Sequence, residues 1–174
     1  KIMTPIKSLF GLLMLSTILM FCAPSSELSS NLKINSFAPS WYMGAGYSSD
    51  STKVSYYHIS QSLDSLVSRN LAKKVADVEL INHIDDRLEN FRTQQHDSEV
   101  WQSSEDIREL RSAVVQLIGR SEVVQSTTQN EGGSYKSYIH LSLSKRDIVD
   151  HLLAIKIFGS SLDAEGVERL YNTL

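Results

Sequence analysis

An apolar run ends at the only cysteine of the chain, and this feature constrains the fold most because it separates an export segment from everything that can form a core. Residues 9–21 are apolar except for one glycine, one serine and one threonine, and Lys7 places a positive charge before them. A membrane-spanning helix needs about 20 apolar residues, whereas a shorter run behind a positive charge is typical of a signal peptide. We therefore expect residues 1–21 to direct export.

Cys22 is predicted to carry a lipid. Leu19 stands three residues before it and Ala23 follows it, a pattern that resembles the lipobox of bacterial lipoproteins. In such proteins the cysteine sulfur accepts a diacylglycerol, and the chain is cut before that cysteine; the thiol supplies the nucleophile. An exported chain with one cysteine cannot form an internal disulfide, so we expect the thiol to have another role.

Phe21 departs from the lipobox, since a small residue usually precedes the cysteine. Two other interpretations of the segment stay open: an uncleaved anchor, or an ordinary signal peptide cut elsewhere. The charge, the length of the apolar run and the lone cysteine together favour the lipoprotein, for which two acyl chains give a stable anchor.

The charge of the chain excludes one class of partner. The formal net charge is −3, and removal of Lys1 and Lys7 with the export segment lowers it by two. Binding to nucleic acid needs clustered lysine and arginine, so we expect no nucleic-acid partner. A mildly acidic surface also argues against holding anionic lipid headgroups by charge alone.

One folded domain is expected after a tether. Residues 22–39 are rich in serine, and all three prolines of the chain precede Trp41. Such a composition predicts a flexible tether. The remaining chain, residues 40–174, has the length of a single domain.

The first half of this domain is predicted to alternate between strands and helices. Residues 41–47 have aromatics at both ends and read as a strand. A helix is expected next, after a turn over residues 48–53. Its apolar stripe consists of Tyr56, Ile59, Leu63, Leu66, Val67, Leu71 and Val75. Residues 77–88 are predicted to be a strand, with the alternative that the helix simply continues to about Phe91.

The second half carries clearer signals. Ser103 or Ser104 caps a helix that Gly119 ends. Residues 123–129 and 134–143 form a hairpin around residues 130–133, which contain two glycines. Ser144 caps a helix over residues 148–158, closed by Gly159, and a last helix covers residues 163–172. The order β-α-β-α-β-β-α predicts an α+β domain, with helices on one face of a small mixed or antiparallel sheet.

Several of these features together resemble the LPP-twenty family of bacterial lipoproteins. They are the lipobox, the serine-rich tether, Pro39-Ser-Trp41, Gly44-Ala-Gly46 and the segment Ser134-Tyr-Lys-Ser-Tyr-Ile-His-Leu-Ser-Leu-Ser-Lys-Arg146. The resemblance covers roughly residues 39–155; the first helix has fewer alanines than the family's, and the chain after Phe158 has no counterpart. It implies an envelope lipoprotein without general catalytic activity, and it carries over no functional residue except Cys22.

Two short motifs suggest catalysis or cofactor binding, and neither is complete. Gly44 and Gly46 form part of a dinucleotide fingerprint whose third glycine is missing, so we assign them to close packing. Ser142 and Lys145 match the S-x-x-K motif of penicillin-binding enzymes, but both partner motifs are absent.

The titratable and aromatic residues give no site either. No pair of histidines has metal-ligand spacing, and we predict no metal and no cofactor. The five histidines are His58, His83, His96, His140 and His151. Asp85 and Asp86 are assigned to a solvated face. The aromatic cluster at the start of the domain is expected to be core, with a partner or glycan surface as the alternative. Its members are Trp41, Tyr42, Tyr47, Tyr56 and Tyr57.

The sequence thus predicts a lipoprotein of the bacterial cell envelope, held at the outer membrane by a lipid on Cys22. We expect no enzyme and no catalytic residue. The folded domain should bind or scaffold an envelope protein or a second copy, through a sheet edge or an exposed face. The alternatives are a periplasmic enzyme whose site is hidden in the linear sequence, and a self-assembling structural module.

Overall fold

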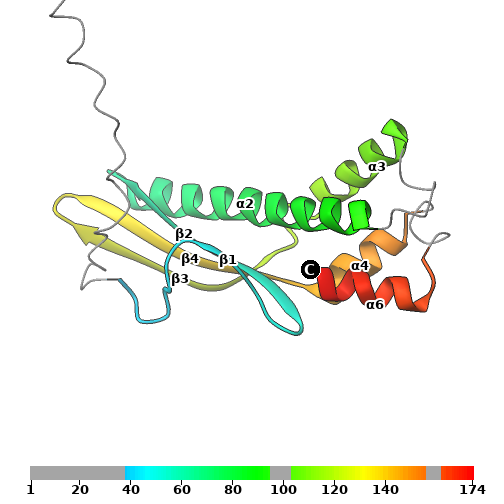
Figure 1. Ribbon diagram of the computed structural model, residues 1–174. Helices are drawn as coiled ribbons and strands as arrows, with labels where there is room; N and C mark the ends of the chain where they lie inside the picture. The colour runs from blue at the N-terminus through cyan, green and yellow to red at the C-terminus, as the bar shows by residue number, and fades with distance from the viewer. Residues whose placement is uncertain (1–37, 95–102, 156–161) are drawn as a thin grey trace, which may run out of the picture. The chain divides into compact units, whose positions relative to one another are not determined.

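The computed structural model describes residues 38–94, 103–155 and 162–174, all within one compact unit, Ala38–Leu174 (Figure 1). Its strands and helices follow the labels of Figure 1. They are β1 (Gly46–Ser49), β2 (Lys53–Ser62), α2 (Ser65–Gln94), α3 (Ser104–Val115), β3 (Glu122–Glu131), β4 (Ser134–Ser144), α4 (Lys145–Leu153) and α6 (Ala164–Thr173). This arrangement is an α+β fold, as the sequence predicts.

The four strands form one antiparallel sheet in the order β1-β2-β4-β3. The long central strands β2 and β4 pair over their whole length, from Lys53 opposite Ser144 to Ser62 opposite Tyr135. Only four residues of β1 add to one edge, and the whole of β3 forms the other. The antiparallel form of the predicted sheet is therefore the one observed.

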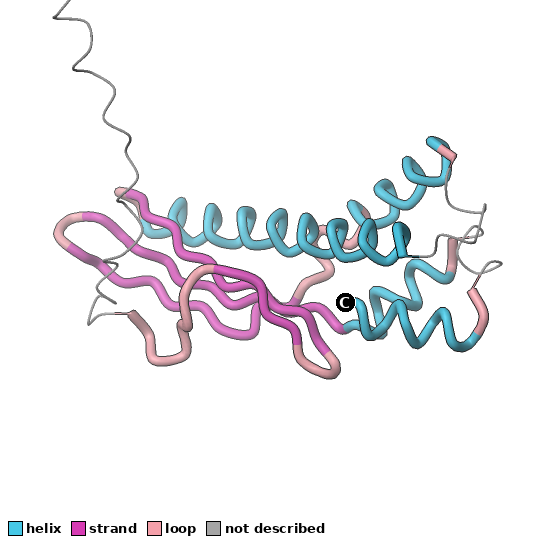
Figure 2. The backbone as a smooth tube through the Cα atoms, viewed as in Figure 1, coloured by secondary structure: helices cyan, strands magenta, loops and turns pink. Residues whose placement is uncertain are grey.

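Helix α2 lies along one face of the sheet, over β2 and β4 (Figure 2). Asp64 caps its start, because its carboxylate accepts a hydrogen bond from the backbone N–H of Val67 at 2.9 Å. The strand side chains beneath it alternate as a half-covered sheet requires. Val54 and Tyr56 of β2 share this face with Leu141 and Leu143 of β4, and all four are buried.

The remaining helices gather near the last turns of α2 (Figure 1). Ser103 and Ser144 cap α3 and α4 by accepting from the backbone N–H three residues on, and Asp163 does the same for α6. Leu152 of α4 and Leu170 of α6 are fully buried in the same hydrophobic core as the sheet. None of the helices among the described residues has the length and hydrophobicity to cross a membrane.

The second half of the sequence folds as expected. The β3–β4 hairpin closes through Gly132 and Gly133, whose φ angles of 60° and 89° suit glycine. The helix predicted after Ser103 is α3, which ends at Val115 and continues as turns up to Gly119, and the helix predicted at residues 163–172 is α6. The third predicted helix is α4, which begins at Lys145 rather than at residue 148 and ends at Leu153, short of the expected Phe158; Gly159 lies outside the described residues.

The helix expected around residue 56 is wrong at its start. Residues 53–62 form β2, and the helix begins only at Ser65. Tyr56 and Ile59 are three residues apart, which suits a helix, but they point to opposite faces of a strand. In the strand, His58 and Ser60 lie on the face that α2 covers. Because these two residues are polar, the sequence shows no alternation of apolar and polar residues that would indicate a strand.

The strand expected at residues 77–88 is also wrong, and the alternative is correct: α2 continues past Phe91 to Gln94. The buried residues Ala76, Leu80, Ile84 and Leu88 recur every four positions, which is a helical spacing. The first strand is shorter than predicted, since it begins at Gly46 instead of residue 41. The order β-β-α-α-β-β-α-α therefore differs from the expected one in this region.

Candidate binding surface along strand β3

Strand β3 is a long, open edge of the sheet. It pairs with β4 on one side, and no strand of the described residues pairs with its other side. An edge strand presents a row of backbone N–H and C=O groups that can pair with another chain. Most of its side chains are exposed as well.

The edge lacks most of the devices that usually block such pairing. Edge strands are commonly protected by lysine, proline or a β-bulge. Between Glu122 and Glu131, β3 contains neither a charged residue nor a proline. A register shift between Val123 and Gln125 interrupts the ladder near one end. Residues 125–131 stay in regular register, and this stretch is open to a further strand.

A groove runs between α2 and this edge strand. Because α2 covers β2 and β4, the side chains of β3 on the same face stay uncovered. The groove has a volume of about 290 Å³. It is lined by Leu66, Arg69, Asn70 and Lys73 of α2, Val123 and Ser126 of β3, and Ile139 of β4.

The charges beside the groove come from basic residues of α2. The stretch from Ser65 to Ala76 contains Arg69, Lys73 and Lys74 and no acidic residue. Lys73 donates to Asp77 one turn further on, at 2.6 Å between Nζ and Oδ2. Asp77 is buried, and it also accepts from the hydroxyl of Ser121, which immediately precedes β3. These contacts fix the start of β3 against α2.

The opposite face of the sheet carries packed aromatic side chains. Tyr57 and His140 stack with their ring centroids 4.2 Å apart, and Tyr42 meets Tyr138 edge-on at 5.0 Å. Burial raises the pKa of Tyr42 to about 12, and burial lowers the pKa of His140, with a smaller effect from Lys53. The aromatic cluster is thus divided between both faces, since Tyr47 and Tyr56 contact His83 on the α2 side.

Among the described residues, four buried side-chain polar atoms lack a hydrogen-bond partner. They are Gln129 Oε1, Glu131 Oε1, His140 Nε2 and Ser142 Oγ. All four residues point to the face of the sheet away from α2, to judge from the register of β3 and β4. They are spread along two strands, and nothing in the described part of the chain gathers them into one site.

Cys22 lies outside the described residues, so its lipidation stays a prediction. Gly44 and Gly46 correct an expectation, because an added Cβ would meet no atom within 4 Å at either position. Close packing therefore does not require them. Their φ angles of 109° and 148° require glycine, since residues with a side chain rarely adopt such backbone conformations.

The S-x-x-K residues do not form a catalytic pair. Ser142 is buried near the end of β4, and its hydroxyl has no hydrogen-bond partner in the part of the chain that the structure describes. Lys145 begins α4, also buried, with Nζ lying 5.8 Å from the ring centroid of Tyr171. Both residues lie at the junction between β4 and α4.

The structure also keeps the other titratable candidates apart. His151 contacts the carbonyl of Ala113 through Nε2 at 3.0 Å, away from the three histidines of the sheet region, and His96 lies outside the described residues. In the described part of the chain, no three residues among His, Cys, Asp and Glu could hold a metal ion. Burial raises the pKa of Asp85, opposed by Arg111 at 3.8 Å, while Asp86 is exposed.

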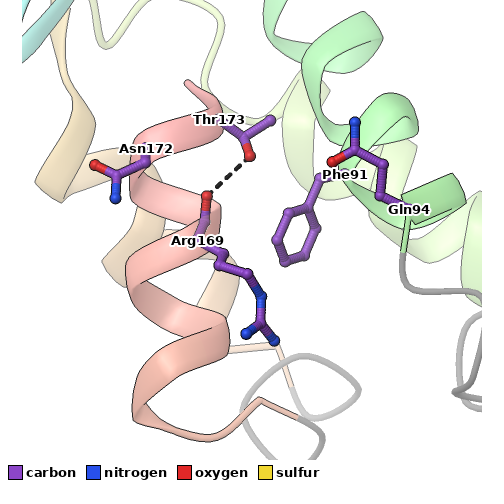
Figure 3. A pocket seen from close by; sticks show the side chains of 5 residues that line it. All are labelled: Phe91, Gln94, Arg169, Asn172 and Thr173. Carbon is purple, nitrogen blue, oxygen red and sulfur yellow. Dashed lines mark hydrogen bonds between the residues drawn. The ribbon is translucent and has the colours of Figure 1, made fainter.

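A second hollow lies between the last turn of α2 and α6 (Figure 3). Its volume is about 430 Å³, and its lining consists of Phe91, Gln94, Arg169, Asn172 and Thr173. Arg169 pairs with Glu165 at 2.8 Å, and its carbonyl accepts from the hydroxyl of Thr173. This lining offers one paired cation and no nucleophile activated by a base, so we assign it no chemistry.

No family model matches the sequence, and neither a curated protein nor a solved structure matches it.

The sequence predicted β3 as a strand but did not show that it is an edge. One signal could have indicated it: ten residues whose only charges are the glutamates at both ends. The sequence did not indicate Arg69 and Lys73 as neighbours of β3, because only the packing of α2 on the sheet brings them beside that strand.

Proposed function

We propose that this protein is a lipid-anchored, non-catalytic component of the bacterial cell envelope, held at the outer membrane, whose folded domain binds or scaffolds an envelope partner. The lone Cys22 behind an export segment supports the anchor. The serine-rich residues 22–39 support a tether, and the resemblance to the LPP-twenty lipoproteins points to the same compartment.

The open edge of β3 carries the binding part of the proposal. A partner strand that pairs with it gains backbone hydrogen bonds, each with a net value of about 1 kcal/mol. Alternate side chains of the partner would lie on the α2 side of the sheet, next to Ser126 and the groove. Specificity then comes from the groove and affinity from the backbone.

The same edge also allows self-assembly, the second candidate function. Two copies of β3 could pair antiparallel about their centres, which are uncharged. That register would place Glu122 of one copy opposite Glu131 of the other, and like charges directly opposite are destabilising. Pairing confined to the regular stretch, residues 125–131, would instead set Gln125 opposite Glu131, so the mass of a crosslinked product has to decide between a second copy and another protein.

A photocrosslinking residue at position 126 tests the edge. In the native envelope, we expect Ser126 replaced by benzoylphenylalanine to give one discrete crosslinked product. Asn82, exposed on α2, serves as the matched position and should give none. A product of twice the subunit mass would identify self-assembly. Equal crosslinking from both positions, or none from either, would refute binding at β3.

Labelling with palmitate tests the anchor separately. The wild type should incorporate the label, and Cys22→Ala should not. Equal incorporation by both proteins would refute lipidation of Cys22, whatever the crosslinking result.

A further inference from the structure

A cluster of apolar side chains at the start of α2 is exposed and serves no purpose in the core. The exposed fractions are 83% for Leu63, 64% for Leu66, 54% for Val67 and 44% for Leu71. Single exposed apolar residues are ordinary, but several within nine consecutive positions form a patch that indicates an interaction. We call these four residues the apolar tip.

The fold explains why the apolar tip stays outside. Ser68, Ala72 and Ala76 are the residues of these turns that are fully buried, and they recur every four positions on the face toward the sheet. Their small side chains let α2 lie close to β2, where the hydroxyl of Ser68 donates to the carbonyl of Ser60 at 3.2 Å. The larger apolar residues must then point elsewhere.

Basic residues lie within the apolar tip and in the turn that follows it. Arg69, Lys73 and Lys74 lie in this part of α2. Asp64 is the acidic residue among them, and its carboxylate is engaged by the N–H of Val67 at the positive end of the helix. Lys73 bonds to Asp77, whereas Arg69 and Lys74 have no ion pair among the described residues.

We infer that the apolar tip docks on an anionic lipid surface. Aliphatic side chains beside lysine and arginine form the combination with which interfacial helices bind bilayers: the apolar residues enter the acyl boundary and the cations meet the headgroups. Each cation near such a surface strengthens binding about fivefold. Charge alone would not hold this acidic chain at an anionic membrane. Cations that lie next to exposed leucines can hold it there.

The patch fits a membrane better than a protein partner. Leu63 lies in the turn from β2 into α2 and is the most exposed of the four, and Leu66 follows in the first turn of α2, where it also lines the groove beside β3. An exposed apolar turn can enter a bilayer, whereas protein hot spots fill concave pockets. The inference does not depend on strand pairing at β3.

Tryptophan quenching in vesicles tests the docking with the full chain. The wild type, Leu66→Trp and Val115→Trp are reconstituted in vesicles of phosphatidylethanolamine and phosphatidylglycerol that contain phospholipid brominated on its acyl chains. Val115 is the matched site because it is also an exposed apolar helical residue, at the end of α3. All three proteins share the same N-terminal segment and the same two native tryptophans.

We expect the fluorescence added by Leu66→Trp to be quenched and that added by Val115→Trp to be spared. Replacing phosphatidylglycerol by phosphatidylcholine, or adding salt, should relieve the quenching. Equal quenching at both sites, or none, would overturn the inference. Leu71→Trp repeats the measurement if the thermal transition shows that Leu66→Trp does not fold.

Charge reversal gives the second arm. In the Leu66→Trp background, Arg69→Glu should weaken docking at least fivefold, and Lys74→Glu should do the same. Arg108→Glu on α3 is the control and should change nothing. Quenching that ignores lipid charge and these substitutions would mean that the apolar residues insert without headgroup recognition, and it would contradict docking on an anionic surface. Failure of docking would leave the crosslinking and palmitate results for the proposed function unaffected.

Discussion

The two halves of α2 show how differently one helix can be used. Its first half, residues 65–76, buries only small residues against the sheet and exposes leucines and valines. Its second half, residues 77–94, buries Leu80, Ile84, Leu88 and Phe91 in the core. The first half carries three basic residues and no acidic one, whereas all five acidic residues of the helix lie in the second.

The difference follows from what lies beside each half. Near the first half, the sheet is the one layer that the described residues provide, so α2 has a single covered face. Around the last turns, α3 and α6 also contact the helix and cover more of its circumference. The same residue type, leucine, is therefore surface in one half and core in the other. We expect the second half to hold the fold and the first half to be free for interaction.

The largest test of this contrast compares two leucines of the same helix. Leu88→Ala should lower the free energy of unfolding by about 2–5 kcal/mol, because it leaves a cavity in the core. Leu66→Ala should change it by no more than about 0.5 kcal/mol, as expected for a surface site. Urea unfolding measures both. Similar losses for the two variants would break the distinction between the halves.

A smaller effect is expected at the boundary between them. Asp77 is buried and accepts from both Lys73 and Ser121, so Asp77→Ala should cost about 2 kcal/mol by removing hydrogen bonds to a charged group. The exposed Asp86, changed to alanine, is the control and should be nearly neutral. Equal stability of the two variants in urea would show that Asp77 does not join α2 to the start of β3.

The contact of the first half with the sheet gives a third test. Ser60 and Ser68 bond reciprocally, each hydroxyl donating to the other residue's carbonyl. Ser68→Ala should therefore cost about 1 kcal/mol. Ser65→Ala, at an exposed position of the same helix, should cost less. Hydrogen exchange should show the loss in residues 65–76 first. Uniform loss over the whole helix would mean that the two halves unfold together.

The smallest effect concerns pH. Burial lowers the pKa of His58, partly offset by Glu79, the carboxylate that faces it from α2. A lowered folded-state pKa means that stability is fully present above the ordinary histidine pKa of about 6.5 and is lost as the pH falls toward the folded value. Acid should thus lower the free energy of unfolding in this pH range, and His58→Gln should weaken this dependence. An unchanged pH profile of hydrogen exchange in that variant would exclude His58 as the cause.

The sequence predicted best where local chemistry decides. Ser103, Ser144 and Asp163 cap their helices through contacts three residues away, and two adjacent glycines close the β3–β4 hairpin. Such contacts need no distant partner, so they can be recognised in the amino-acid sequence. The predicted fold class rests mostly on these elements.

The prediction failed where distant contacts decide. His58 and Ser60 lie on the covered face of β2, where Ser60 bonds to Ser68 of the helix above and His58 stacks on Tyr56 of its own strand. Residues 77–88 satisfy an apparent strand pattern, yet they are helical because a continuous row of their apolar residues packs into the core. The candidate surface was missed for the same reason, since Arg69 and Ser126 are far apart in the chain.

What the sequence alone determined is therefore the α+β class, the capped helices, the hairpin and the expectation of an anchor at Cys22. Only the tertiary structure decided that β3 is an open edge and that the leucines at the start of α2 lie outside the core. Caps and turns form between residues a few positions apart. Exposure is the absence of a covering neighbour, which depends on where every other element packs.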